Sequence, residues 1–435
     1  MAELASKAPA TQMDYDVAVV GAGPAGIAAA CVAAEAGRSV ALLDATPWLG
    51  GQIWRKSASN ALPGTAAEWL ARLERSRVQV LGRTTVVAVP GPHQLLAESP
   101  RDPLAIGWRK LILATGAREL FLPFPGWTLL NVVGPGGLQV LTKSGWPMEG
   151  KRVVVAGSGP LLIAAAAYLR KAGAQVLLIA EQADWSQLLP FGLSLARNAP
   201  DKLLQAAQYQ WKLLGVPYRP GCWPVSASGR EQLETVTLRS GERTWTVPCD
   251  YLACGFGLVP NVELAELLGC QTQDDVVTVS PLQETSLEGI YAAGECTGIS
   301  GVEGAIVEGR IAGHAAAGQP AQAEALFGQR ARTWRFADSM ARAFALRPEV
   351  KSLAAPDTTV CRCEDVSLQQ LRPFDGWRAA KLHTRCGMGP CQGRVCGGAA
   401  RVILGWHPTS VRPPLFPTSV ETLAAACHGA APAPH

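Results

Sequence analysis

The stretch Val17-Ala18-Val19-Val20-Gly21-Ala22-Gly23-Pro24-Ala25-Gly26 determines the fold class of this 435-residue chain. A short apolar run leads into a glycine turn, and an Ala-rich segment follows to about Glu35. In such a strand–turn–helix unit, the glycines permit a tight turn, close approach of the backbone to a pyrophosphate, and helix–strand packing. The helix N-terminus adds N–H donors and a positive dipole end. The sequence therefore predicts a dinucleotide site formed by Gly21, Ala22, Gly23, Pro24, Ala25 and Gly26.

An acidic residue and an internal repeat extend this pattern. Asp44 ends the next apolar strand, where a carboxylate accepts hydrogen bonds from ribose hydroxyls. The segment from Lys151 to Glu181 repeats the order of strand, glycine turn, Ala-rich helix and second strand that runs from Asp16 to Asp44. Two βαβ units in one chain predict an α/β fold with two Rossmann-like dinucleotide-binding domains.

The second glycine motif, Gly157-Ser158-Gly159-Pro160-Leu161-Leu162, departs from the first. Leu162 replaces the third glycine, and no arginine pair follows to bind a 2′-phosphate. A count of residues from the first glycine of each motif aligns Ala180 with Asp44, and it places Glu181 one residue after that position. Gly157 and Gly159 are candidate nucleotide contacts, and three alternatives stay open: NAD(P), another nucleotide, or a purely structural domain.

Cysteines are concentrated near the C-terminal end of the chain. Cys361-Arg362-Cys363 is followed by the run from Cys386 through Cys391 to Cys396, which contains three glycines. A [2Fe-2S] cluster needs four converging thiolates, and a Cys-x-Cys pair with a Cys-x4-Cys pair can supply them. Seven basic residues against three acids between 361 and 401 would favour such an anionic cluster. Structural zinc, which usually uses wider Cys-x2-4-Cys spacing, and disulfides are the alternatives.

Two local patterns concern the remaining cysteines and a helix start. Ser367-x-x-Gln370 predicts a capping box at the start of a short helix. The seven cysteines outside the cluster lie mostly in apolar segments and are expected to be buried and inert.

From about Asp14 to Gly318 the chain resembles the flavoproteins with two dinucleotide-binding domains, among them glutathione and thioredoxin reductases. The resemblance rests on Gly50-Gly51-Gln52, on Ala114-Thr115-Gly116-Ala117 and on Gly289 to Glu295. It implies FAD at the first motif and a glutathione-reductase-like fold. No cysteine follows Gly50-Gly51-Gln52, and none lies between Val133 and Leu141, so disulfide reduction is not expected. The implied additional FAD contacts are Asp44, Gly51, Gln52, Ala114, Thr115, Gly116, Gly294 and Glu295, the last standing where the family usually has Asp.

The cysteine-rich module resembles the bacterioferritin-associated-ferredoxin-like [2Fe-2S] domain. The match lies in Thr384-Arg385-x-Gly387-Met388-Gly389-x-Cys391-Gln392-Gly393. By that resemblance the module is a small helical C-terminal domain, and Cys386 is a fifth candidate that could replace one ligand. The implied ligands are Cys361, Cys363, Cys391 and Cys396.

The full order of motifs resembles the α-subunits of heteromeric amine and opine dehydrogenases. These include D-hydroxyproline dehydrogenase, hydrogen cyanide synthase, nopaline/octopine oxidase and dye-linked L-proline dehydrogenase. The resemblance implies a partner β-subunit whose own FAD oxidises the C–N bond of an amine, with a small third subunit in some complexes. This chain would then pass electrons through FAD and [2Fe-2S] to an acceptor that the sequence does not identify. A stand-alone NAD(P)H-dependent reductase and a nucleotide-holding scaffold are the alternatives.

Composition and patterning limit location and partners. The net charge of +4 does not indicate nucleic-acid binding. The chain shows no apolar leader and no run of about 18 apolar residues, so we expect a cytoplasmic protein, with peripheral contact at the inner membrane face left open. The expected domains are a flexible tail (1–13), an FAD domain (14–120 and 251–320), an inserted NAD(P)-type domain (121–250), a helical connector (321–355), a [2Fe-2S] domain (356–410), and a Pro-rich strap with a disordered tail (411–435).

Overall fold

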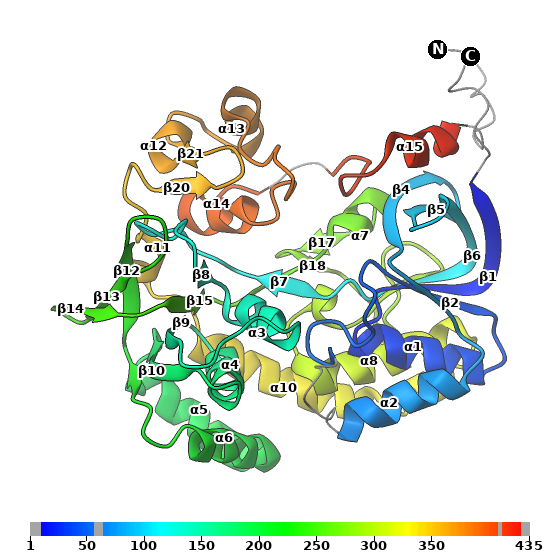
Figure 1. Cartoon of the computed structure of the whole chain (residues 1–435). Coiled ribbons are helices and arrows are strands. Elements are labelled where there is room, and N and C mark those ends of the chain that lie inside the picture. Colours follow the sequence, from blue (N-terminus) through cyan, green and yellow to red (C-terminus); the bar gives the residue numbers. More distant parts are fainter. Residues whose placement is uncertain (1–9, 56–63, 408–410, 428–435) are drawn as a thin grey trace. The chain divides into compact units, whose positions relative to one another are not determined.

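Two units make up the part of the chain that the computed structural model describes, which is residues 10–55, 64–407 and 411–427 (Figure 1). Within those residues the first unit takes 10–118, 260–334 and 411–427, and the second takes 119–259 and 335–407. Two short strands, β7 (Ala117–Glu119) and β16 (Leu258–Pro260), lie where the chain passes between the units. The finer division into domains stays a prediction.

The first unit is built on a seven-stranded sheet. Its order is β3-β2-β1-β6-β5-β4, and β19 also pairs with β6. The pairs β1–β2, β1–β6, β2–β3 and β6–β19 are parallel, whereas β4–β5 and β5–β6 are antiparallel. The strands are β1 (Thr11–Val20), β2 (Val40–Asp44), β3 (Gln79–Gly82), β4 (Thr85–Gly91), β5 (Gln94–Glu98), β6 (Leu104–Leu113) and β19 (Ile290–Ala292).

The central strand β1 shows why the glycine motif lies at one edge of this sheet. Val17, Ala18 and Val19 are fully buried, as expected for a parallel strand covered on both faces. The strand begins earlier than expected, because Thr11 pairs with Leu104 of β6. Residues 11–13 therefore belong to the sheet rather than to a flexible tail, and residues 1–9 lie outside the described part of the chain.

Helix α1 (Pro24–Glu35) packs in the core of the first unit between α2 (Gly64–Arg75) and α8 (Gly301–Ala316) (Figure 1). Pro24 stands at the first helical position, where its missing N–H costs no intrahelical bond. Small alanine side chains keep the helix close to its neighbours. Other elements of this unit are α7 (Glu263–Leu268), β17 (Thr272–Gln273), β18 (Val276–Val277), the 3-10 helix η2 (Glu295–Thr297), α9 (Pro320–Glu324) and α15 (Val420–Cys427).

The second unit contains a five-stranded parallel sheet in the order β11-β10-β9-β15-β8 and a three-stranded antiparallel sheet β12-β13-β14. The strands are β8 (Val132–Val133), β9 (Arg152–Gly157), β10 (Gln175–Glu181), β11 (Tyr218–Pro220), β12 (Trp223–Ser228), β13 (Thr235–Ser240), β14 (Arg243–Pro248) and β15 (Tyr251–Gly255). Its helices before residue 259 are α3 (Pro135–Lys143), α4 (Pro160–Lys171), α5 (Trp185–Asn198) and α6 (Pro200–Lys212).

Helix α10 (Phe327–Ala343) carries the chain back into the second unit, where α11 (Pro348–Lys351) and the cysteine-rich module follow. The module has a strand pair, β20 (Thr359–Cys361) with β21 (Val366–Ser367), and three helices, α12 (Leu368–Leu371), α13 (Trp377–Thr384) and α14 (Cys396–Leu404) (Figure 1). The capping box expected at Ser367 and Gln370 is confirmed at the start of α12. Trp127 Nε1 donates to the Thr359 carbonyl at 2.6 Å and so fastens the module to the second unit.

Candidate cofactor sites

The first glycine turn is held in shape by Asp44. One carboxylate oxygen accepts from the Ala22 N–H at 2.7 Å, and the other accepts from the N–H and hydroxyl of Thr46, both at 2.8 Å. Gly21 has a φ of +107°, and a Cβ there would lie 2.2 Å from the Ala114 carbonyl oxygen. The turn therefore requires glycine at this position, and the acid at the end of β2 directs the turn's backbone.

A cavity lies directly beyond this turn. The N-terminal ends of α1, at Pro24, and of α8, at Gly301, both reach it. A Cβ at Gly23, Gly116 or Gly301 would meet no atom within 4 Å, so the backbone is open there to a ligand. Two converging helix N-termini favour an anionic group, and a pyrophosphate fits that requirement. The lining residues are Gly23, Pro24, Ala25, Ile53, Ala114, Gly116, Ala293, Glu295, Gly301, Val302 and Ala305.

The other predicted FAD residues lie around this cavity in supporting positions. Gly51 approaches the turn closely, since a Cβ there would be 3.1 Å from the Gly23 Cα. The Thr115 hydroxyl donates to the Asn261 carbonyl at 2.6 Å. Gly26 packs against the Gly21 carbonyl, and Gln52 is exposed. Their contacts with FAD stay predictions.

The sequence reasoning missed Glu308, a buried acid of α8. Its carboxylate accepts from the Gly294 N–H and the Thr297 hydroxyl, both at 2.9 Å, and from the Trp334 Nε1 at 2.7 Å. Burial raises the pKa of Glu308 and also that of Glu295, which lines the cavity. Glu308 thus holds the backbone of the Gly289–Glu295 motif from α8, while Glu295 lines the cavity. The available signal was a single acid in the Gly- and Ala-rich stretch from 304 to 316.

The cysteine beside Glu295 is a packed residue, as expected. Cys296 is fully buried, and its thiol lies 3.4 Å from the carbonyl oxygens of Leu113 and Ala293. Desolvation raises its pKa to about 11. Cys31 and Cys270 of the same unit are also buried, which agrees with a structural role for these thiols.

The second glycine motif differs from its expected alignment. A β-bulge between Val176 and Leu178 absorbs one residue of β10, so that Ala180 pairs with Ala156 and Glu181 pairs with Gly157. Glu181, and not Ala180, therefore occupies the position that Asp44 has in the first unit. The sequence count was wrong here because a bulge adds a residue without advancing the strand.

The chemistry around Glu181 nevertheless differs from that around Asp44. Glu181 is 1% exposed, and its carboxylate accepts from the Gly159 N–H at 2.8 Å and the Ala183 N–H at 3.0 Å. Desolvation raises its pKa to about 7. Asp44, by contrast, is only half-buried.

Five cysteines converge in the C-terminal module. The thiol sulfurs of Cys361, Cys386 and Cys396 all lie within 4.8 Å of one another, and the three side chains are buried. Cys363 and Cys391 interact with each other, and Cys391 interacts with Cys396, so that all five form one continuous set. Hydrogen bonds from Cys386 and Cys396 lower the pKa of Cys361 to about 2. The structure thus brings together the four predicted ligands and places Cys386 among them.

The loop that contains Gly389 passes close to the cysteine side chains. A Cβ at Gly389 would lie 2.3 Å from the Cys363 Cβ, so the loop passes directly over this cysteine. Arg385 pairs with Glu364 at 2.8 Å on the adjoining surface. Soft thiolate donors on two loops suit an iron–sulfur cluster or zinc.

Comparison with known proteins identifies the family. Residues 15–323 match the pyridine nucleotide-disulphide oxidoreductase family, and the chain belongs to it. It is a FAD-dependent oxidoreductase. Among curated relatives, it is 31% identical to the A subunit of opine oxidase from Agrobacterium tumefaciens (strain Ach5), covering 92% of this chain and 87% of that protein. It is 30% identical to the HcnB subunit of hydrogen cyanide synthase from Pseudomonas protegens, covering 89% and 91%.

Solved structures confirm the expected α/β fold with Rossmann-like nucleotide-binding architecture. L-proline dehydrogenase from P. horikoshii matches with a TM-score of 0.65 at 20% identity, over 96% of this chain and 81% of that one. Thioredoxin reductase from T. acidophilum matches with a TM-score of 0.54 at 20% identity, over 70% and 98%. No helix among the described residues is long and apolar enough to cross a membrane.

Proposed function

We propose that this chain is the electron-transferring subunit of a heteromeric amino acid or opine dehydrogenase of the D-hydroxyproline dehydrogenase type. A separate FAD-containing β-subunit would oxidise the amine, and this chain would carry the electrons on to an acceptor. A cytoplasmic location, with or without contact at the inner membrane face, stays a prediction, as does a small third subunit. The observation that carries the proposal is one chain with both a cavity at two helix N-termini and a group of five neighbouring cysteines.

The first unit supports FAD binding through its own residues. Gly23 and Gly116 leave open space, and the N-termini of α1 and α8 provide N–H groups and positive dipole ends toward a pyrophosphate. Asp44 lies at the end of β2, where its remaining acceptor capacity is available to a ribose. Glu295 lines the same cavity and is the proposed acceptor for the ribityl chain.

The cysteine module supports a [2Fe-2S] cluster. We assign Cys361, Cys363, Cys391 and Cys396 as ligands, with Cys386 as the alternative for one of them. When bound, a flavin exchanges two electrons and can release them singly, and an iron–sulfur cluster carries one at a time. Arg362, Arg378 and Lys381 belong to a basic module that would favour the more negative reduced state.

The relatives support a partner in a heteromeric complex. The opine oxidase and hydrogen cyanide synthase relatives are both named as subunits, and this chain covers 87% and 91% of their lengths. Among the first unit's cysteines whose side chains the structure describes, Cys31, Cys270 and Cys296 are single buried thiols and offer no exchangeable dithiol. These two facts together favour electron transfer within a complex over disulfide reduction.

The proposal is tested by purifying the tagged chain gently from its native host and identifying a stoichiometric partner by mass spectrometry. The isolated complex is then mixed anaerobically with a panel of amino acids and opines. We expect a second flavoprotein, and bleaching of flavin absorbance by one member of the panel. A chain that purifies alone, and whose flavin is bleached by NADH, would instead establish a stand-alone reductase.

A further inference from the structure

We propose that the second dinucleotide fold takes no nucleotide, because the chain's own segment Phe344–Arg347, here called the connector segment, occupies the nucleotide's place. In a fold of this type the adenosine lies beyond the carboxyl ends of the first two strands, between the glycine turn and the acid. In this protein those strand ends are Gly157 of β9 and Glu181 of β10. NAD(P)H would then not donate electrons to this chain. The statement about NAD(P)H rests on the function proposed above, whereas the occupation of the second site by the connector segment does not.

Ser158 links the glycine turn to the connector segment. It lies between Gly157 and Gly159, within the turn that meets the pyrophosphate in a dinucleotide site. Its hydroxyl donates to the Phe344 carbonyl at 3.1 Å and accepts from Gln182 Nε2 at 3.0 Å. The turn's polar side chain is therefore already satisfied by the protein.

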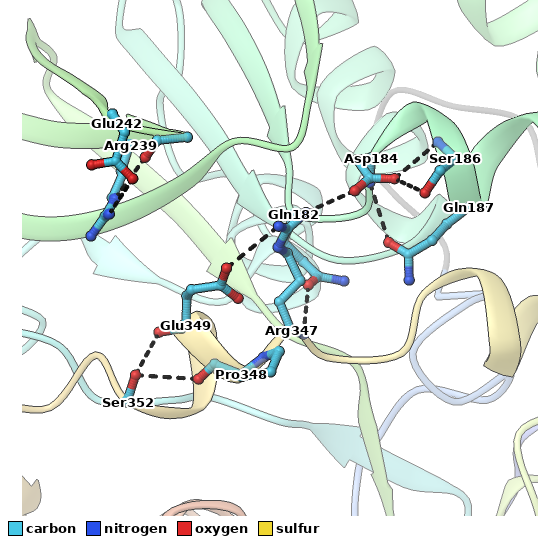
Figure 2. A network of polar contacts seen from close by, with 11 residues as sticks. Gln182, Asp184, Ser186, Gln187, Arg239, Glu242, Arg347, Pro348, Glu349 and Ser352 are labelled. Carbon is cyan, nitrogen blue, oxygen red and sulfur yellow. Dashed lines mark hydrogen bonds and ion pairs between the residues drawn. The ribbon is translucent and has the colours of Figure 1, made fainter.

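Gln182, the residue after β10, has no exposed surface and directs its amide to the connector segment (Figure 2). Its Nε2 donates to the Ala345 carbonyl at 3.1 Å, and its Oε1 accepts from the Arg347 N–H at 3.0 Å. These bonds pair the side-chain amide with backbone on both sides of residue 346. Displacing the connector segment would leave a buried amide without partners, which is costly.

Arg347 anchors the end of the connector segment. Its guanidinium pairs with Asp184 at 3.0 Å (Figure 2). It also lies over the Trp223 ring, 5.1 Å from the centroid. At the other end, the Phe344 ring packs edge-on against Phe191, with centroids 5.4 Å apart. Both ends are thus fixed by side chains of the second unit, in addition to the backbone contacts between them.

The acid of the second fold is also closed to a ribose, because Glu181 is 1% exposed whereas Asp44 is half-buried. Glu181 uses its carboxylate on the Gly159 and Ala183 N–H groups and is buried. The Gly159 N–H belongs to the turn that would meet a pyrophosphate. Because the Glu181 carboxyl already holds that N–H, a bound phosphate would lose a donor at this turn. An added Cβ would meet no atom within 4 Å at Gly159 or at Gly23, so the folds differ in the contacts of Ser158 and Gln182 with the connector segment rather than in space at this glycine.

The inference is tested by calorimetric titration of the full FAD-loaded chain with NADH, NADPH and ATP, alongside hydrogen exchange of the backbone. We expect no saturable binding at ligand concentrations up to about 1 mM, the upper range of ordinary nicotinamide KM values. Hydrogen exchange at the Arg347 amide should be slow and unchanged by any of the three nucleotides. Saturable binding below about 1 mM, with faster exchange in residues 344–347, would overturn the inference.

Two variants examine the contacts directly. Gln182→Ala removes both amide contacts and should accelerate exchange in residues 344–347 by about tenfold or more. Gln175→Ala, at the exposed start of the same strand, is the matched control and should leave that exchange unchanged. If Gln182→Ala is poorly folded, Arg347→Ala instead removes the guanidinium contacts with Asp184 and Trp223, and exchange is read at Ala345 and Leu346. Unchanged exchange in a folded variant would contradict the proposed anchoring.

The same preparation separates this inference from the proposed function. If nucleotide binds but the partner's amine substrate still bleaches the flavin, only the inference fails. If neither nucleotide nor amine reduces the flavin of an intact complex, the proposed electron-transfer function fails while the occupied second site stands.

Discussion

The backbone N–H of Arg347 donates to the side-chain oxygen of Gln182 at 3.0 Å, and this bond joins a segment after α10 to the strand end where a second nucleotide would bind. In the first fold, Ala22 stands between the two glycines where the second fold has Ser158, and it has no hydroxyl that could hold such a segment. The two βαβ repeats are therefore proposed to differ in what they bind. The first has a cavity for an anionic cofactor at Gly23, and the second binds the connector segment at its glycine turn.

Gly23→Val should abolish FAD binding while the protein stays folded. No protein atom lies within 4 Å of the added Cβ, so the side chain enters the ligand's space without disturbing the core. Flavin absorbance after gel filtration measures occupancy, and circular dichroism measures folding. Gly91→Val, in a strand and equally free of neighbours, is the control and should keep its flavin. Normal flavin content in Gly23→Val would refute the placement of the pyrophosphate.

Gly26→Ala should instead destabilise the fold itself. The added Cβ would lie 1.8 Å from the Gly21 carbonyl oxygen, so α1 must move away from β1. Overpacking of this kind costs about 1–3 kcal/mol, and more where backbone has to shift. Thermal unfolding followed by circular dichroism should show a clear fall in Tm. Gly64→Ala, at the start of α2 with no atom near its Cβ, should show none, and equal Tm values for the two variants would argue against this packing.

Replacing the cluster ligands should remove acid-labile sulfide without removing FAD. We expect this result for Ser substitutions of Cys361, Cys363, Cys391 and Cys396, because each removes one thiolate. Cys386→Ser should retain sulfide if that thiol is not a ligand. Cys270→Ser, whose hydroxyl could keep the contact with Thr285, is the control outside the module.

The outcome for Cys386 decides the ligand set. It lies in the buried group with Cys361 and Cys396, whereas Cys363 is exposed. Loss of sulfide in Cys386→Ser together with its retention in Cys391→Ser or Cys363→Ser would correct the assignment. Retention of sulfide in every variant would exclude the module as the cluster's site.

Glu181 should make the stability of the second unit depend on pH. Burial raises its pKa from 4.5 to about 7, so between these values the folded protein holds a proton that the unfolded chain releases. Stability should therefore fall as pH rises through this window and level off above it, by an amount on the order of 3 kcal/mol. Glu181→Gln stays neutral, and its stability relative to wild type should improve from about pH 5 to about pH 8.

Denaturant unfolding at several pH values measures this difference. Glu242→Gln changes a fully exposed acid and serves as the control. A stability difference between Glu181→Gln and wild type that does not vary with pH would show that Glu181 does not titrate in this window.

Local features of this protein could be predicted from its sequence, whereas features that depend on distant contacts could not. The turn at Gly21 and the capping box at Ser367 involve residues close in the chain, and both occur as expected. The alignment of Glu181 failed because a bulge at Val176–Leu178 depends on pairing with β9. Spacing alone cannot show whether one strand of a pair carries an extra residue.

The candidate sites divide in the same way. Glycine spacing located the cavity at Gly23 because the ligand contacts follow from one strand–turn–helix unit. The contact of Glu308 with Gly294 requires helix α8 to pack against the Gly289–Glu295 motif. The connector segment lies more than 150 residues from Gln182 in the chain, so no sequence pattern indicated that it reaches the second glycine turn.

Both cofactors are assayed together in the anaerobically purified full chain by its content of FAD, iron and acid-labile sulfide and by an electron paramagnetic resonance spectrum after dithionite reduction. We predict one FAD, about two iron atoms and about two sulfides per chain, with a signal typical of a reduced [2Fe-2S] centre. About one zinc per chain, with no labile sulfide and no such signal, would contradict the account.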